Sequence, residues 1–252
     1  MQKLLYSVIT IWALSIMPSQ HLFGQLNNEY SGQGSGGSIS TGDNNTGFGD
    51  STAVNLTSGG DNVTLGYKAG YGLTSQSQAV FIGFQTGFSS DTDNDNTFIG
   101  FRSGFYNDGG DDHVFVGNGA GFMNTTGNDN VFIGEKAGIR NTDGDDNTFI
   151  GNNAGGSVRT LTSTSDASYD TPITGDDNTG VGANALLEIT TGFRNTAVGN
   201  DAGYDVTTGY RNTMLGDSAG TDLSSGHHNT FVGSASGPCL LYTSPSPRDL
   251  AQ

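Results

Sequence analysis

The sequence predicts an all-β protein, a parallel β-solenoid of eleven coils of 17 residues each. A short phrase recurs as DNTFIG at 95–100, DNVFIG at 129–134 and DNTFIG at 146–151. The chain holds 41 glycines and only 33% hydrophobic residues, which leaves too little apolar volume for a conventional core. The phrase is also rich in β-branched and aromatic residues, which favour strands.

The glycine that ends the phrase sets the repeat, and we number each coil from it as position 1. Each step within a block is 17 residues, and the step from Gly151 to Gly182 is 31, one period plus an insertion of 14. The repeats cover residues 39–237, with an insertion loop at about 157–173 that is either a neutral bulge or a recognition loop. Position 1 is occupied by Gly49, Gly66, Gly83, Gly100, Gly117, Gly134, Gly151, Gly182, Gly199, Gly216 and Gly233.

Each coil contains one predicted strand at positions 15 to 17. Position 15 is Thr or Val in every copy, and alternate residues of a strand share a face, so positions 15 and 17 are both predicted to face a narrow interior. Small residues at position 4, such as Ala69 and Ala120, are expected to let a second short strand cross nearby. Position 17 is Phe48, Leu65, Ile82, Ile99, Val116, Ile133, Ile150, Val181, Val198, Leu215 and Val232.

Asparagine occupies position 14 in nine of the eleven copies, and Ala79 and His113 are the exceptions. Stacked amides are expected to form a ladder that also satisfies the turn backbone. Glycines at positions 1, 5 and 11 are expected at the corners. At about 4.8 Å per coil, the eleven coils would form a rod roughly 50 Å long.

Aromatic residues gather at two further positions. If positions 15 and 17 face inward, position 16 faces outward, and the exposed rings would make a patch larger than soluble monomers usually show. We therefore predict self-association, with a wider single-chain β-helix that has aromatics on two inner walls as the alternative. The rings are Phe81, Phe98, Phe115, Phe132, Phe149 and Phe231 at position 16, and Tyr71, Phe88, Phe105, Phe122 and Tyr204 at position 6.

The two ends of the chain differ from the repeats. Residues 1–24 place Lys3 before an apolar run that is short for a membrane span, which predicts a secretory signal peptide and hence a secreted or cell-surface protein. Residues 25–38 are expected to be a flexible leader. Residues 238–252 are expected to be a non-native or disordered tail, because CLLYTSPSPRD resembles a translated sequencing adapter, and the natural C-terminus is then missing. Cys239 in this tail is expected to carry no chemistry.

The charge and the histidines narrow the function. With 25 acidic and 9 basic residues, the net charge of −16 argues against nucleic acid or anionic membranes as partners. His21, His113, His227 and His228 form no zinc-ligand pattern, and no Ser is placed with a His as a nucleophile would require. We therefore predict no catalytic, cofactor or metal residues and no enzyme activity.

The remaining chemical candidate is acidic. Stacked carboxylates at positions 12 and 13 favour either a solvated acidic edge, the preferred interpretation, or Ca²⁺ binding. The last three coils hold Phe193, Tyr210 and His227 there, each followed by Arg or His, so the edge is not uniform. An ice-binding Thr surface is disfavoured because the Thr position is predicted to face inward. The acidic residues are Asp43, Asp61, Asp95, Asp111, Asp112, Asp129, Asp145, Asp146, Asp176 and Asp177.

The motif NTxxGxxAG resembles the left-handed β-roll heads of YadA-type trimeric autotransporter adhesins and the repeats of secreted Bacteroidota "tail fiber domain-containing" proteins, over about four fifths of the chain. The resemblance implies a homotrimeric left-handed β-roll used for surface display and adhesion, with an unknown protein or glycan receptor. A monomeric calcium-dependent or ice-binding solenoid, or a phage tail-fibre fragment, remains as the alternative. The residues that carry the motif are Asn96, Thr97, Gly100, Asn130, Gly134, Ala137, Gly138, Asn147, Thr148, Gly151, Ala154 and Gly155.

Overall fold

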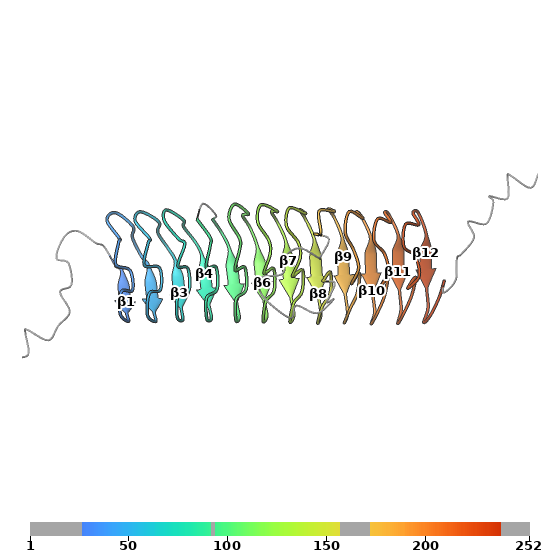
Figure 1. Cartoon of the computed structure of the whole chain (residues 1–252), viewed down its shortest axis with the longest axis horizontal. Coiled ribbons are helices and arrows are strands. Elements are labelled where there is room, and N and C mark those ends of the chain that lie inside the picture. The colour runs from blue at the N-terminus through green and yellow to red at the C-terminus, as the bar shows by residue number, and fades with distance from the viewer. Residues whose placement is uncertain (1–26, 92–93, 157–171, 238–252) are drawn as a thin grey trace, which may run out of the picture.

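The protein is a rod built from one parallel sheet. The structure, a computed structural model, describes residues 27–91, 94–156 and 172–237. Its twelve strands pair in chain order and delimit eleven turns of a solenoid, which confirms the predicted fold class (Figure 1). The strands are β1 (Glu29–Ser31), β2 (Thr46–Phe48), β3 (Val63–Leu65), β4 (Val80–Ile82), β5 (Thr97–Ile99), β6 (Val114–Val116), β7 (Val131–Ile133), β8 (Thr148–Ile150), β9 (Thr179–Val181), β10 (Thr196–Val198), β11 (Thr213–Leu215) and β12 (Thr230–Val232).

The register of the sheet follows the repeat. Each strand residue pairs with the residue 17 positions along, as Phe98 does with Phe115. Across the insertion Phe149 pairs with Gly180, so the 31-residue step leaves the ladder unbroken. Residues 157–171 of the predicted insertion loop lie outside the described residues, and Ile173 already forms a parallel bridge with Asn141 of the preceding coil.

The predicted direction of the strand faces is wrong. Position 16 faces the interior, and positions 15 and 17 are half-buried or exposed. One Phe ring buries more apolar area than a Thr or Val, so placing the rings inside stabilises the rod more. The rings of Phe81, Phe98 and Phe115 stack at 4.8 Å with interplanar angles of 3° and 8°. The aromatic inner wall of the single-chain alternative is therefore present. The fully buried rings are Phe81, Phe98, Phe115, Phe132 and Phe149.

The rings at position 16 are accommodated by glycines at position 5 of the next coil. A Cβ built on Gly138 would lie 2.5 Å from the Phe132 ring, and its φ is +55°. Where position 16 is itself glycine, the following position 5 is larger: Gly47 precedes Ala53, and Gly180 precedes Leu186. Ala53 and Leu186 are fully buried, so volume is exchanged between two residues six apart.

The return limb of each coil consists of turns, so the predicted second strand is wrong for the described residues. Positions 3 and 13 adopt left-handed conformations with non-glycine residues, such as Lys68 at φ +53° and Asp146 at φ +56°. The small side chain of Ala120 at position 4 is fully buried. The predicted corner glycine Gly110 at position 11 has no positive φ, and is required by close approach, because its Cβ would lie 2.2 Å from the Gly127 carbonyl oxygen.

The solenoid begins earlier than predicted. Strand β1 lies within the segment expected to be a flexible leader, and Tyr30 pairs with Gly47 of β2. The sequence does contain the signal, because Gly32 precedes Gly49 by 17 residues and Asn28 occupies position 14. The backbone N–H of Asn45 donates to the Asn28 side-chain oxygen at 2.7 Å, so the asparagine ladder starts here.

Candidate functional site

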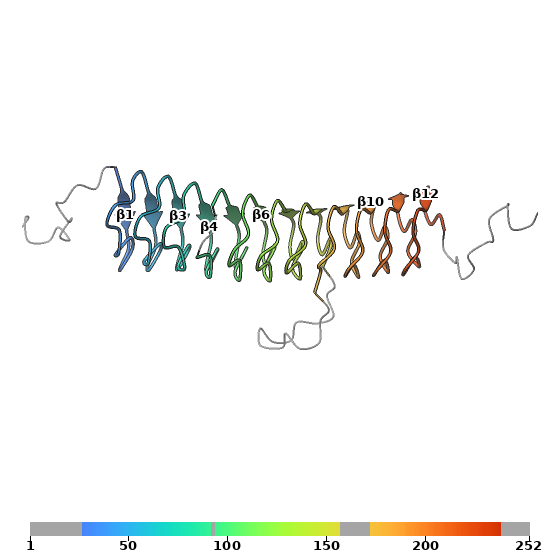
Figure 2. The same cartoon turned by 90° about the horizontal axis from the view of Figure 1, so that it is seen from above.

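The outward surface of the sheet, which we call the sheet face, consists of positions 15 and 17 of β2 to β12. It carries the aliphatic residues that were expected inside. Its most exposed apolar side chains include Phe48 (49%), Leu215 (48%) and Val232 (66%). The face has one uninterrupted register along the rod, and Figure 2 shows the strands aligned along one side. A continuous apolar surface of this kind is unusual for a soluble monomer.

The sheet face changes along its length at position 15. From β2 to β7 this position holds Val in four strands and Thr in two, whereas Thr occupies it in every strand from β8 to β12. Each of these Thr residues pairs in register with the next, for example Thr196 with Thr213. The C-terminal part of the sheet face is therefore a column of hydroxyl and methyl groups beside the aliphatic column of position 17.

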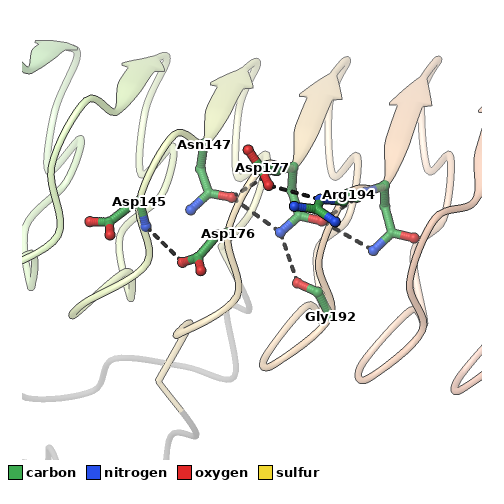
Figure 3. A network of polar contacts seen from close by, with 8 residues as sticks. Asp145, Asn147, Asp176, Asp177, Gly192 and Arg194 are labelled. Atoms are coloured by element: carbon green, nitrogen blue, oxygen red, sulfur yellow. Dashed lines mark hydrogen bonds and ion pairs between the residues drawn. The ribbon is translucent and has the colours of Figure 1, made fainter.

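The predicted asparagine ladder is present at position 14. The Asn147 side-chain oxygen accepts the backbone N–H of Asn178 at 3.0 Å and its Nδ2 at 3.1 Å. The same Nδ2 donates to the Gly192 carbonyl at 2.8 Å, which ties each amide to the turn of the following coil (Figure 3). Because Asn147 and Asn178 are fully buried, these bonds satisfy groups that water cannot reach.

His113 takes the place of an asparagine in this ladder. Its Nδ1 accepts the backbone N–H of Asn130 at 3.1 Å, and its ring also bonds the Gly127 carbonyl. Burial lowers the pKa of His113 to about 3, against the opposing effect of the Gly127 bond. The ring is therefore neutral at physiological pH and plays a structural part.

A second buried amide ladder at position 8 was missed by the sequence analysis. Asn124 Nδ2 donates to Asn107 Oδ1 at 2.6 Å, and Asn141 Nδ2 donates to Asn124 Oδ1 at 2.7 Å. The coil before Asn107 holds Ser90 at this position, and other coils hold aliphatic residues there, so an average over all copies hides the asparagines. The aliphatic residues are Leu56, Leu73, Ile189, Val206 and Leu223. The recurrence of Asn at spacings of 17 residues was the available signal.

The carboxylates at position 12 accept hydrogen bonds from backbone N–H groups. Asp111 Oδ1 accepts the Asn94 N–H at 2.7 Å, and Asp145 Oδ1 accepts the Asn128 N–H at 2.7 Å. Asp176 Oδ1 in turn accepts the Asp145 N–H at 3.0 Å (Figure 3). Asn94 and Asn128 make the same bond in their coils, so these coils use an oxygen acceptor at position 12 rather than a negative charge.

The carboxylates at position 13 point into solvent. Partial desolvation and repulsion from Asp129, Asp177, Asp145 and Asp176 raise the pKa of Asp146. The column ends at Asp177, which pairs with Arg194 Nε at 3.0 Å in the next coil. This exposed pair neutralises the end of the acidic edge and contributes little to stability.

The structure brings the predicted acidic residues onto one edge without gathering them around a point. Within residues 27–91, 94–156 and 172–237, no group of three or more His, Cys, Asp or Glu is arranged to hold a metal ion. His227 stacks on Tyr210 at 4.7 Å, and Tyr210 stacks on Phe193 at 4.9 Å, so rings replace carboxylates in the last coils. His21 and Cys239 lie outside the described residues.

A further surface feature combines rings with cations. We call it the aromatic–cation strip, formed by positions 2, 3 and 6 of the coils that start at Gly66, Gly83 and Gly100. Tyr67, Phe84 and Phe101 stack at 5.3 and 5.4 Å, and a parallel column stacks at position 6. Arg102 lies between the columns, 5.2 Å from the Phe101 ring centroid and 5.3 Å from that of Phe105.

Comparisons of the chain with protein-family models, curated proteins and solved structures find no significant match. In the part of the chain that the structure describes, no helix is long and apolar enough to cross a membrane.

Proposed function

We propose that the chain is a segment of a homotrimeric fibre, secreted or held at the cell surface, that acts as a structural and adhesive element without catalysis. The observation that carries the proposal is the sheet face: a continuous, largely apolar surface that runs along the rod. Burying it against copies of the same chain removes apolar area from water along the whole length.

The interior supports a role as a rigid spacer. Stacked rings, two buried amide ladders and the position-12 acceptors connect each coil only to its neighbours, and all repeat along one axis. Such a rod holds its surface features at fixed spacing. In a trimer, each feature is presented three times, and weak contacts add through avidity.

Sedimentation of the full chain tests the trimer. We expect a trimeric mass at micromolar concentration, and a monomer for the double substitution Ile133→Lys and Leu215→Lys, which places charges on the sheet face. The matched control is Thr126→Lys with Thr208→Lys, because both are exposed turn residues at position 10. This control should remain trimeric. A monomeric wild-type chain would refute the oligomer.

The Thr column favours a second candidate function, an ice-binding face. The sequence disfavoured this function because position 15 was predicted to face inward, but in the structure position 15 lies on the outward sheet face. The column consists of Thr148, Thr179, Thr196, Thr213 and Thr230. Regular hydroxyl and methyl groups on a flat sheet can order water. This use competes with trimer formation for one surface, so a monomer with thermal hysteresis that is lost on Thr196→Lys would favour it over the fibre.

A further inference from the structure

The aromatic–cation strip is an exposed surface with a defined internal order. The side chains of Tyr67, Phe84 and Phe101 are 43%, 41% and 47% exposed. Neighbouring ring centroids in this column lie 5.3 and 5.4 Å apart. Rings stacked directly face to face would have centroids about 3.5–4.0 Å apart, so these rings are offset sideways from one another. Each ring therefore leaves part of its face open to a ligand.

The cations of the strip are held between the two ring columns. Lys68 Nζ lies 5.4 Å from the Tyr67 centroid and 5.1 Å from that of Tyr71. Arg102 occupies the same place two coils along, where its Nε donates to Gln85 Oε1 at 3.0 Å. Position 3 thus presents a cation, a neutral amide and a cation in succession, with rings on both sides.

The strip is a positive island in an acidic protein. The chain has a net charge of −16, yet the coils that start at Gly66, Gly83, Gly100 and Gly117 hold no acidic residue at positions 2, 3, 6 or 7. Asp50 and Glu135 at position 2 bound this region on the two sides. Free anionic groups are therefore attracted here and repelled by most of the remaining surface.

The spacing selects the kind of anion. Parallel strands lie about 4.8 Å apart, so Lys68 and Arg102 are separated by about 10 Å along the rod. An extended acidic peptide presents side chains on one face about every 6.8 Å, which does not match. In an extended β-linked polysaccharide, each sugar lengthens the chain by nearly the spacing between two coils. A charged group on every second sugar would therefore meet Lys68 and then Arg102. The uncharged sugar between them would meet Gln85.

From this match we propose that the aromatic–cation strip binds an anionic polysaccharide with one carboxylate or sulfate on every second sugar. The charged groups pair with Lys68 and Arg102, and the apolar C–H faces of the sugars pack on the open parts of the rings. The inference specifies a receptor class for the proposed adhesive function and rests on it, but it does not depend on the trimer.

The test is calorimetric titration of the full chain with hyaluronan oligosaccharides, which carry a carboxylate on alternate sugars. Carboxyl-reduced hyaluronan, polyglutamate and phosphatidylglycerol vesicles serve as the neutral, peptide and membrane probes. We expect binding to hyaluronan that weakens with salt, and at least about tenfold weaker binding to each of the other probes.

The neighbouring coils supply matched variants. Lys68→Gln with Arg102→Gln copies Gln85, which adopts the same left-handed φ of +53°, so these variants should fold. Phe84→Asn copies Asn118 at position 2. We expect each variant to bind hyaluronan about tenfold more weakly. Arg211→Gln removes an exposed cation at position 13, before the strand rather than in the strip, and copies Gln78 at that position, so it should leave the affinity unchanged.

Equal losses in Arg211→Gln and the double variant would overturn the proposal, because general charge would then explain binding. Absence of hyaluronan binding, or equally tight binding of polyglutamate or vesicles, would also overturn it. The two proposals fail separately. A trimer without glycan binding removes only this inference, and a monomer that binds the glycan removes only the fibre assembly.

Discussion

His113 shows how an imidazole ring can make the hydrogen bonds that asparagine makes at position 14 of other coils. Asparagine at position 14 supplies an acceptor for the N–H of the next coil and a donor for a turn carbonyl, and Ala79 is the described residue there that supplies neither. A neutral imidazole provides both as well, and its ring also stacks on Phe115 at 4.6 Å. An imidazolium would have no acceptor, so protonation opposes the fold.

The stability of the rod should therefore depend on the titration of His113. The unfolded side chain has a pKa near 6.5 and the folded one a pKa of about 3, so its contribution is complete above pH 6.5 and is lost as pH falls toward 3. At pH 5 the loss is about 2 kcal/mol. We expect thermal melts at pH 7.5 and pH 5 to differ less in His113→Asn than in the wild type. His228→Asn, at an exposed turn, should retain the wild-type difference, and a similar difference in both variants would contradict the prediction.

The acidic edge offers a second prediction for one residue. Asp145 accepts a backbone N–H, and Asn94 and Asn128 do the same in other coils, so Asp145→Asn should leave the melting temperature nearly unchanged. Asp145→Ala leaves that N–H without its acceptor and should cost about 1 kcal/mol. A chelator should not change the melting temperature of the wild type. A large chelator effect would instead indicate bound Ca²⁺.

The single coil is the element of this fold, and its interior is filled by an exchange of volume between position 16 and the next position 5. A ring at Phe132 requires Gly138, whereas Gly180 allows Leu186. Both residues lie inside one narrow cross-section, so neither can change alone without a void or an overlap.

A double-mutant cycle tests this exchange. Gly138→Leu alone forces a side chain into the Phe132 ring and should cost about 3 kcal/mol, and Phe132→Gly alone opens a cavity and should cost about 3–5 kcal/mol. The double variant copies Gly180 and Leu186 and should recover about 2 kcal/mol relative to the sum. Urea unfolding midpoints of the four proteins measure the coupling. Additive losses would show that the two positions are independent.

The 17-residue period of the sequence predicted the length of the coil and the register of its strands. It did not predict which strand positions face the interior. A three-residue strand gives two candidate interiors, Thr97 with Ile99 or Phe98 alone, and counting apolar positions favoured the wrong one. The available signal was the exchange of volume six residues apart, between Phe132 with Gly138 and Gly180 with Leu186, because two positions that trade volume share one interior. The aromatic–cation strip could not be predicted, since its columns come together only when the turn positions 2, 3 and 6 are placed in space.

At the scale of the whole molecule, the rod is one-dimensional. Each coil bonds to the coils before and after it, and the sheet order follows the chain from β1 to β12. Stability in such a protein is close to a sum over coils and their interfaces, so losing one interior coil should weaken the rod without unfolding it. The insertion before β9 shows that the ladder already tolerates a change in length outside the strands.

Deletion of one complete coil separates register from length. Removing residues 117–133 joins Val116 to Gly134 and leaves Phe115 next to Phe149, so the shortened rod should keep its β-sheet circular dichroism and melt only a few degrees lower. Removing residues 117–132 keeps Ile133 and delays the next glycine by one residue. Because a shift of one residue exchanges the two faces of a strand, the following turn must absorb it or the rings turn outward. We expect this variant to melt far lower or to aggregate, although it is one residue longer. Equal melting temperatures for the two deletions would mean that the 17-residue register does not hold the rod together.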